Sequence, residues 1–298
     1  MNTTQSLKGV FLVALGASSY GMLATFVKLA YLENFTTAEV TVSQFVLGIL
    51  GMVFVLGFQK IKTKQKAIQA SSKNKFQLIL AGTSLGMTSV FYYLAVRYIP
   101  VSIGIVLLMQ TVWMAVVLDV FLERKAPSFR KIVAVVIVLI GTALATNILS
   151  KEIQLDWRGI FWGMLAAASF TTTMFTSNRI AAHLSAPERS LWMLFGGAII
   201  VFGFAFYSQQ TPFNLEIFMK WGIVLALFGT VIPPMLLNAG FPLTGIGLGS
   251  IVASLELPVS VLMAYFLLHE QVVFLQWLGI ILIISAIVLM NIQIKKQS

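Results

Sequence analysis

The sequence predicts an all-α integral membrane protein whose ten transmembrane helices form two inverted five-helix repeats. Three observations lead to this fold class. The 298 residues are 58% hydrophobic and only 10% charged, with a mean hydropathy of +0.92, and a soluble domain carries more charge. Apolar runs of about the length that spans a bilayer recur along the whole chain. Matching residues also recur at a spacing of about half the chain, which is typical of duplicated transporters.

Charged or turn-forming residues bound each apolar run, and a hydrocarbon core about 30 Å thick needs about 20 apolar residues per helix. We therefore expect helices at Leu7–Leu29, Ala38–Phe58, Phe76–Val96, Val101–Leu122, Ile132–Ile148, Trp157–Ser177, Leu191–Tyr207, Trp221–Ala239, Leu248–Leu268 and Phe274–Ile292. The first run is longer than the apolar region of a signal peptide, so we expect it to remain in the mature protein.

Basic residues predict the orientation of the chain. Fifteen of the 20 lysines and arginines fall on one face when the loops are counted alternately, many of them between Lys60 and Lys75. Because lysine and arginine favour the cytoplasmic side, we expect a multi-pass protein of the plasma (inner) membrane with both termini in the cytoplasm. Anionic lipid headgroups attract the same residues, so the net charge of +10 does not indicate nucleic acid as a partner.

Composition also argues against several kinds of chemistry. The chain has no cysteine and two histidines, so we expect no disulfide framework, metal centre or cofactor. A phosphate-binding G-x-x-x-x-G-K-[ST] loop is missing, which argues against an ATP-driven pump. Gly245, Gly247 and Gly249 follow no strand, so we interpret them as a tight connection rather than a phosphate loop. No catalytic residues are expected.

The internal repeat is the most informative pattern. With a shift of 150 residues, Lys8-Gly9-Val10-Phe11 recurs as Arg158-Gly159-Ile160-Phe161, and with a shift of 147, Gly82-Thr83 recurs as Gly229-Thr230; Glu39 similarly recurs as Glu188. This pattern divides the chain into repeats 1–150 and 151–298. Because five helices are an odd number, the second repeat enters the membrane from the opposite face, and inverted repeats of this kind build secondary transporters.

One carboxylate stands inside the ninth apolar run. On insertion scales a charged residue at the centre of a membrane helix costs about 2.5–3.5 kcal/mol, so Glu256 is a candidate for proton coupling or for binding a solute cation. Pro258 follows it and removes a backbone donor, which predicts a helix kink near Ser254. The alternative is that Glu256 only braces this kink, and the sequence leaves both interpretations open.

Polar residues on other helices are candidates for the wall of a solute cavity. On the sixth helix Ser169, Thr172 and Thr173, together with Thr176, have the spacing of one helical face. Ser84, Thr88 and Tyr92 recur every four residues on the third helix. Serines and threonines in membrane helices also bond to their own backbone or join neighbouring helices, so packing is the alternative for both sets.

Two further candidates lie on the fourth and eighth helices. Gln110 and Trp113 are three residues apart and could hold a zwitterion or a flat ring, or else form an ordinary interhelical contact. Asn238, near the end of the eighth helix, would lie at the inner mouth of the cavity. Tyr20 on the first helix completes the expected substrate-binding set.

The two halves resemble a known family. Each closes its fourth helix with an aromatic, leucine and glutamate pattern, Phe121-Leu122-Glu123 and Phe266-Leu267-Leu268-His269-Glu270. The chain is similar, over nearly its whole length, to the EamA branch of the drug/metabolite transporter superfamily. The resemblance implies a secondary carrier with a cavity lined from both halves, and an acid followed closely by proline, as Glu256 and Pro258 are here.

Two positions set this chain apart within the resemblance. At the shift of 147, Met109 and Thr111 stand where the second half has Glu256 and Pro258, so the acid is present in one half only. Tyr20-Gly21 stands where many members have a tryptophan-glycine pair.

The sequence therefore predicts a secondary carrier, not an enzyme, that exports a small organic metabolite by alternating access. Amino acids are the expected class, and the aromatic candidates favour hydrophobic or aromatic ones. The expected partners are the solute, the lipid bilayer and protons. A vitamin or nutrient importer of the same architecture is the alternative within transport. A lipid scramblase or a membrane-embedded enzyme is the alternative from another class.

Overall fold

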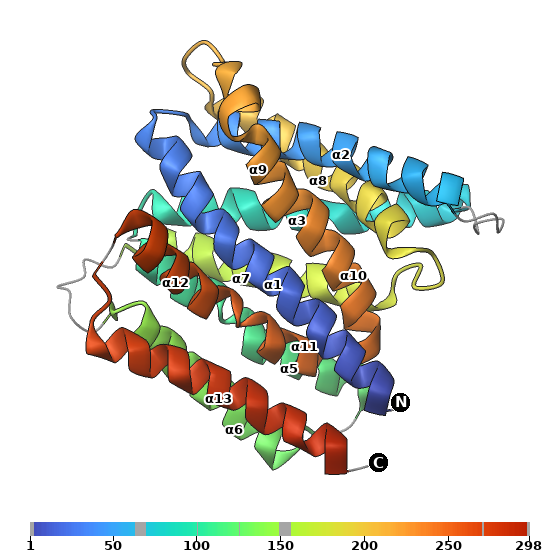
Figure 1. The fold of residues 1–298 in the computed structure, drawn as a ribbon, viewed down its shortest axis with the longest axis vertical. Coiled ribbons are helices and arrows are strands. Elements are labelled where there is room, and N and C mark those ends of the chain that lie inside the picture. The colour runs from blue at the N-terminus through green and yellow to red at the C-terminus, as the bar shows by residue number, and fades with distance from the viewer. Residues whose placement is uncertain are drawn as a thin grey trace.

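A computed structural model of the chain describes residues 3–62, 70–99, 101–124, 126–148, 156–269 and 271–296. Within these ranges all regular elements are helices, which confirms the all-α class (Figure 1). The elements are α1 (Thr3–Leu32), α2 (Thr37–Lys62), α3 (Ser72–Val96), α4 (Val101–Leu108), α5 (Thr111–Glu123), α6 (Phe129–Ala145), α7 (Trp157–Arg179), α8 (Ala186–Ser208), η2 (Phe218–Gly222), α9 (Ile223–Ala226), η3 (Leu227–Val231), α10 (Ile232–Thr244), α11 (Ile246–Ala253), α12 (Glu256–Leu268) and α13 (Phe274–Lys296).

Helix occupies each of the predicted ranges, but fewer segments qualify as membrane spans by length and composition alone. Within the described residues seven segments do so: Gln5–Leu32, Thr37–Gln59, Ser72–Ala95, Ile103–Leu122, Ala186–Ser208, Phe218–Thr244 and Ile246–Leu268. The apolar part of α13, Phe274–Met290, is shorter, and α6 and α7 are not among the seven. These spans make the chain a multi-pass membrane protein.

The fourth segment is broken, although the sequence predicted one helix over Val101–Leu122. Met109 and Gln110 separate α4 from α5, and no proline lies there. The backbone N–H of Gln110 donates to the Leu107 carbonyl, three residues earlier, and not to the Val106 carbonyl, four residues earlier. The Val106 carbonyl instead accepts from the Gln110 side chain, over 2.9 Å. The Gln110 side chain thus gives the Val106 carbonyl the hydrogen bond that the Gln110 backbone N–H would make in an unbroken helix.

The ninth segment is broken at the corresponding place, where Ser254 and Leu255 separate α11 from α12. Pro258 has no N–H to donate to the Ser254 carbonyl. That carbonyl accepts from the Leu257 N–H over 3.2 Å. A break therefore replaces the simple kink that the sequence predicted. The matching break at Gln110 shows that proline is not required for such an interruption.

The eighth segment is longer than predicted and irregular. The two π-helical stretches η2 and η3 flank the short α9, and α10 begins next to Pro233 and Pro234. Pro233 and Pro234 cannot donate to the carbonyls of Gly229 and Thr230, one turn earlier, and the backbone widens into i→i+5 turns at η3, where these two residues lie.

The broken segments fix the register between the halves. α11, α12 and α13 each begin 145 residues after α4, α5 and α6, as 246 does after 101. Arg124 and His269, which end α5 and α12, share a left-handed conformation with φ of 53°. With this shift of 145 residues, the position equivalent to Glu256 in the first half is Thr111, and not Met109 as the shift of 147 suggested.

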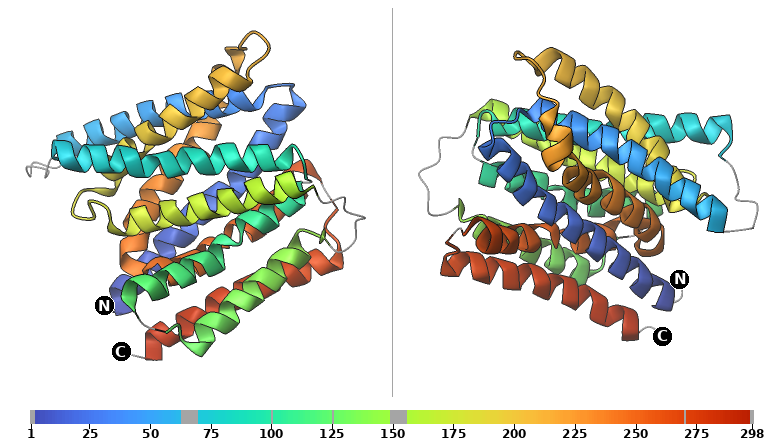
Figure 2. Two further views of the ribbon diagram at one scale, coloured as in Figure 1. Left: turned by 180° about the vertical axis from the view of Figure 1, so that it is seen from behind. Right: turned by 45° about the horizontal axis from the view of Figure 1, so that its top comes forward.

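Helix contacts cross between the two halves. α1 packs on α10 and its counterpart α7 packs on α3, while α6 and α13 lie side by side along one edge (Figures 1 and 2). A Cβ added at Gly141 would lie 2.9 Å from the Gly279 carbonyl oxygen, so these two glycines allow α6 and α13 to approach closely. The N- and C-terminal ends lie at the same end of the molecule (Figure 2).

The repeated acids Glu39 and Glu188 also bond across the halves. The Glu39 carboxylate accepts from the Asn214 N–H over 2.7 Å, and from the Gln209 side chain over 3.2 Å. The Glu188 carboxylate accepts from the Ala70 N–H over 3.0 Å. Each acid thus holds the segment that precedes the third helix of the other half.

Candidate functional site

Glu256 begins α12, directly after the break in the ninth segment. Its side chain is half-buried, and its carboxylate has no hydrogen-bond or ion-pair partner among the described residues. The start of a helix carries a partial positive charge that favours a carboxylate. The break therefore places the acid where the backbone tolerates its charge.

Gly21 of α1 packs directly on the Glu256 backbone. A Cβ built at Gly21 would collide with the Glu256 carbonyl oxygen and would lie 2.9 Å from the Val259 Cβ and 3.1 Å from the Ser260 nitrogen. Only glycine permits this approach between α1 and α12 without a shift of backbone. Its neighbour Tyr20 thereby lies within electrostatic range of the Glu256 carboxylate.

Tyrosines from α3 complete the surroundings of Glu256. Tyr92 also lies within electrostatic range of the carboxylate. The ring of Tyr93 meets the ring of Tyr92 edge to face, with centroids 6.1 Å apart. The hydroxyl of Tyr31 on α1 lies 3.2 Å from the Thr37 hydroxyl. Tyr20 of α1 and Tyr92 of α3 are therefore the phenols in the neighbourhood of the acid.

Thr111 occupies a similar place in the fourth segment, because it begins α5 directly after a helix break as Glu256 begins α12. Its hydroxyl lies 2.7 Å from the hydroxyl of Thr171, which is at the position of α7 that matches Gly21 at the shift of 150. Thr111 therefore has a hydroxyl partner on α7, whereas Gly21 on α1 has no side chain to offer Glu256.

Gly21→Ala is expected to disturb the site through the backbone of α12. The methyl group would overpack a contact made by main-chain atoms, at a cost of about 1–3 kcal/mol, so the apparent melting temperature in detergent should fall. Gly57→Ala is the matched control, because a Cβ there meets nothing within 4 Å. Equal melting temperatures for the two variants would contradict the close approach of α1 and α12.

Gln110 and Trp113 contact each other rather than an open space. The Trp113 indole N–H donates to the Gln110 side-chain oxygen over 2.9 Å, and the Gln110 amide is used at the break of its own segment. Trp113 is 36% exposed. The expected pair is therefore formed, with the polar atoms of both side chains engaged in the contact.

The polar residues on the third and sixth segments face each other in part. Ser84 of α3 and Thr173 of α7 are both buried, with their hydroxyl oxygens 2.8 Å apart. Thr88 donates to the Ser84 carbonyl over 2.8 Å, and the Ser169 carbonyl accepts from Thr173 over 3.1 Å. The Ser84–Thr173 contact joins α3 to α7, and the other two bonds lie within one helix each, as the packing alternative expects.

Thr172 departs from the predicted common face. It is exposed, and its hydroxyl donates to the Ala168 carbonyl one turn earlier over 2.9 Å. Thr173 and Thr176 are buried. One residue corresponds to about 100° of helix rotation, so Thr172 and its neighbour Thr173 point to different sides of α7.

A narrow cavity with room for about one water molecule lies between α1, α3, α7, α8 and α10. Its lining brings together three of the predicted site residues, Tyr20, Thr173 and Asn238. The Asn238 side chain is buried and donates to the Ser190 hydroxyl over 2.9 Å, whereas its Oδ1 has no partner. A residue with an unpaired acceptor therefore lines the cavity, and Tyr20 lies both in this lining and near Glu256.

Arg189 is a buried residue that the sequence did not single out as a site residue. It is 1% exposed and donates to three backbone carbonyls, those of Ile180, Asn238 and Ser177. The Asn238 carbonyl is free because Pro242, four residues later, has no N–H. Arg189 thus joins the end of α7 to the middle of α10 beside the cavity.

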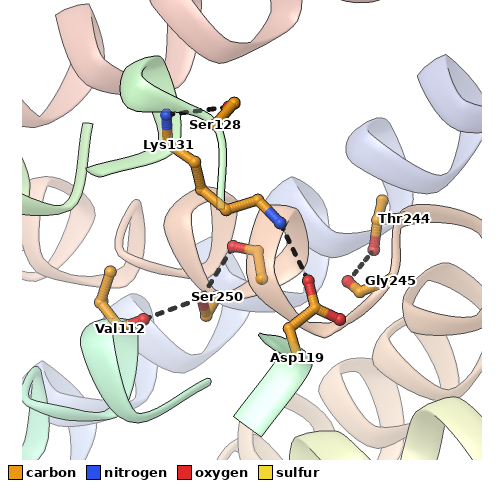
Figure 3. A network of polar contacts seen from close by, with 8 residues as sticks. Val112, Asp119, Ser128, Lys131, Thr244, Gly245 and Ser250 are labelled. Atoms are coloured by element: carbon orange, nitrogen blue, oxygen red, sulfur yellow. Dashed lines mark hydrogen bonds and ion pairs between the residues drawn. The ribbon is translucent and has the colours of Figure 1, made fainter. Parts of the chain in front are cut away.

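Asp119 forms an ion pair at the end of α5 (Figure 3). The Lys131 ammonium of α6 lies 2.9 Å from its Oδ2. A Cβ at Gly247 would lie 2.7 Å from the same oxygen, so this glycine lets the start of α11 approach the pair. Gly245, with φ of +73°, makes the turn between α10 and α11. The glycines of this stretch therefore serve a tight connection.

Chemically, the central region offers one unpaired carboxylate, phenols and an amide oxygen. Among the residues that the structure describes, no three His, Asp or Glu side chains lie close enough together to hold a metal ion. Such a region can bind and release a proton, or can accept hydrogen bonds from a solute.

Comparisons with known proteins give a consistent result. Residues 7–147 and 157–292 match the EamA-like transporter family. A Salmonella typhimurium (strain LT2) protein named YicL, an uncharacterized inner membrane transporter, is 28% identical over 184 residues. That alignment covers 59% of this chain and 59% of the relative's length. One crystal structure of a protein superposes with a TM-score of 0.78 at 12% identity, over 97% of this chain and 98% of the other, so the fold is shared.

Proposed function

The chain belongs to the EamA-like transporter family, and from this premise we propose that it is a secondary carrier that exports a small organic solute, with amino acids and related amines as the first classes to test. The family and the membrane spans make it a multi-pass transporter of the inner membrane. Export by alternating access and coupling to protons are parts of the proposal.

We further propose that residues 1–150 and 151–298 are inverted repeats that rock against each other. The two separately matched stretches, 7–147 and 157–292, support this division. It is also supported by the helix starts, since α11 and α12 begin 145 residues after α4 and α5 and each pair is separated by a two-residue break. Because each half contributes five segments, the second would enter the membrane from the opposite face. Both termini would then lie in the cytoplasm, in line with the bias of lysine and arginine.

The observation that carries the proposal is the unpaired carboxylate of Glu256 at a helix break. Broken helices at the centre of transporters commonly form solute and ion sites, because their ends present free backbone and charge. Carboxylates inside membrane proteins often mark proton relays. Glu256 would therefore couple solute movement to a proton, with Tyr20 and Tyr92 beside the solute and Thr173 and Asn238 deeper in the wall.

The remaining predicted residues would have supporting roles in this scheme. Ser84 would hold α3 against α7 and Thr88 would bond within α3. Gln110 with Trp113 would stabilise the break between α4 and α5. Pro258 would keep the break beside Glu256 open. Ser169 and Thr172 would contribute through the backbone of α7 rather than through solute contact.

The direction of transport is tested in cells. Deleting the gene in its host should sensitise growth to the exported solute when amino acids and amines are supplied one at a time. A plasmid carrying the wild-type gene should restore resistance, and one carrying Glu256→Gln should not. Loss of uptake of a supplied nutrient on deletion would instead identify an importer and contradict the export proposal.

A further inference from the structure

We propose that an anionic phospholipid binds where α3 and α8 begin, at Lys73, Lys75 and Trp192. The two lysines hold the phosphate of its headgroup, and the apolar sides of the same two helices hold its acyl chains. This site is separate from Glu256, and it does not depend on which solute the protein carries.

The positive charge at this end of the molecule is not balanced by acids of the chain. Six lysines lie between Lys60 and Lys75, and no aspartate or glutamate occurs from residue 40 to residue 118. Within the described ranges, no ion pair involves Lys73 or Lys75. Glu188 of α8 approaches this end, but its carboxylate accepts from a backbone N–H before α3 over 3.0 Å. Lysines on the predicted cytoplasmic face attract the anionic lipids of that leaflet, so the charges are complementary.

An aromatic ring on the other helix holds Lys75 in place. The Lys75 ammonium lies over the ring of Trp192, 5.0 Å from its centroid, and Trp192 is partly buried. An ammonium group has three N–H donors, and a contact with the face of a ring leaves donors on the side away from the ring. The Trp192 indole N–H donates to no other residue in the part of the chain that the structure describes. Lys75 and Trp192 together therefore offer donors to a phosphate group.

An apolar surface continues from this contact along both helices. Four large apolar side chains are exposed there, two on each helix and one turn apart: Phe76 (68% exposed), Leu80 (62%), Phe195 (36%) and Ile199 (62%). Both pairs start beside the contact, because Phe76 follows Lys75 and the Phe195 ring lies 5.6 Å from the Trp192 ring. A lipid whose headgroup lies at Lys75 would therefore pack its acyl chains on these side chains.

The site lies across a contact between the two matched stretches of the chain, since α3 belongs to the first and α8 to the second. A Cβ built at Gly82 or at Gly196 would collide with a main-chain carbonyl of the opposite helix, so α3 and α8 meet backbone to backbone. The Asn74 side chain lies 3.1 Å from the His183 ring at the same end. A headgroup that touches Lys75 and Trp192 would favour the conformation in which these helices are together.

Lipid binding is measured on the purified full-length protein, delipidated in detergent, by native mass spectrometry. The probes are phosphatidylglycerol and phosphatidylcholine with the same acyl chains, and glycerol 3-phosphate as a headgroup without chains. We expect one phosphatidylglycerol to bind about tenfold or more tightly than phosphatidylcholine, because two lysines contribute to its binding. Glycerol 3-phosphate at the same concentration should not displace it, since the acyl chains supply part of the affinity.

Variants locate the bound lipid. Lys73→Gln and Lys75→Gln should each weaken phosphatidylglycerol binding about fivefold, and the double variant should lose the preference over phosphatidylcholine. Trp192→Leu should weaken binding, because the ring that holds Lys75 is lost. Lys220→Gln makes the same charge change at a lysine that is paired with Glu216 and Glu33, and should bind phosphatidylglycerol as the wild type does.

Melting curves show whether each variant remains folded, and Lys73 is exposed, so Lys73→Gln alone keeps the test decisive if the Trp192 variant unfolds. Equal binding of the two lipids or an unchanged preference in the double lysine variant would overturn the proposal. Displacement of the lipid by glycerol 3-phosphate would make this a site for soluble phosphates and would overturn it as well.

Discussion

Arg189→Met is expected to lower the stability of the protein more than Gly21→Ala does. Methionine fills much of the same volume but leaves the carbonyls of Ser177, Ile180 and Asn238 without a donor in a dry interior. Unsatisfied buried polar groups cost about 1–3 kcal/mol each, so we expect a loss of about 3 kcal/mol or more. Removing the cost of burying the guanidinium offsets part of this loss.

The melting temperature of the purified protein in detergent measures this effect, and a fall of about 5–10 °C is expected. Arg189→Lys is the matched control, since an ammonium group retains the charge and can reach some of the three carbonyls. Its melting temperature should lie between those of the wild type and Arg189→Met. A methionine variant as stable as the wild type would show that Arg189 does not hold α7 to α10.

Glu256→Gln is expected to abolish the response of transport to a proton gradient. Glutamine has nearly the same shape but cannot bind and release a proton, so the solute and the proton no longer compete for one group. In proteoliposomes with an imposed pH gradient, the gradient-driven part of solute release should fall to the level of protein-free vesicles.

Asp119→Asn provides the matched control for a carboxylate within the spanning segments. Asp119 is paired with Lys131, so its substitution should lower stability while the response to the gradient remains. If transport by Glu256→Gln still responds fully to the pH gradient, Glu256 is not the proton-coupling residue and only stabilises the helix break near Pro258.

The sequence predicted the helical architecture because hydrophobicity alone separates spans from loops in a membrane protein. Charged residues place the helix ends to within about a turn: α2 continues past Lys60 to Lys62, and α3 begins at Ser72, before Lys75. The break at Met109 and Gln110 could not be predicted, since it depends on a side-chain hydrogen bond from Gln110 to Val106 rather than on proline. The basic segment between Lys60 and Lys75, which we expected on the cytoplasmic face, lies partly outside the described residues, which omit 63–69.

The candidate site was predictable where one residue is unusual by itself. Glu256 stands out as a carboxylate in an apolar run, and Pro258 marks the break beside it. Gly21 did not stand out as a packing residue, because its role depends on α1 and α12 meeting in space. Arg189 was counted with the basic residues near helix ends, because its carbonyl partners Ser177, Ile180 and Asn238 lie outside its own helix and are known only from the fold.

The position equivalent to Glu256 in the first half also differs between the prediction and the structure. Short identities such as Gly82-Thr83 and Gly229-Thr230 gave a shift of 147, which pairs Glu256 with Met109. The loops of the two halves differ in length, so one shift cannot hold throughout, and the helix bounds place Thr111 opposite the acid. The contrast between the Thr111–Thr171 pair and Glu256 beside Gly21 is visible only in that register.

The measurement that tests the central claim most directly is solute release from proteoliposomes that contain the purified wild-type protein. The vesicles are loaded with labelled amino acids and amines, one solute at a time, and release is followed with and without an imposed pH gradient. We predict that at least one solute leaves faster than from protein-free vesicles and faster again when the gradient is applied. Release of every solute at the protein-free rate would contradict the assignment of this chain as a secondary carrier of small organic solutes.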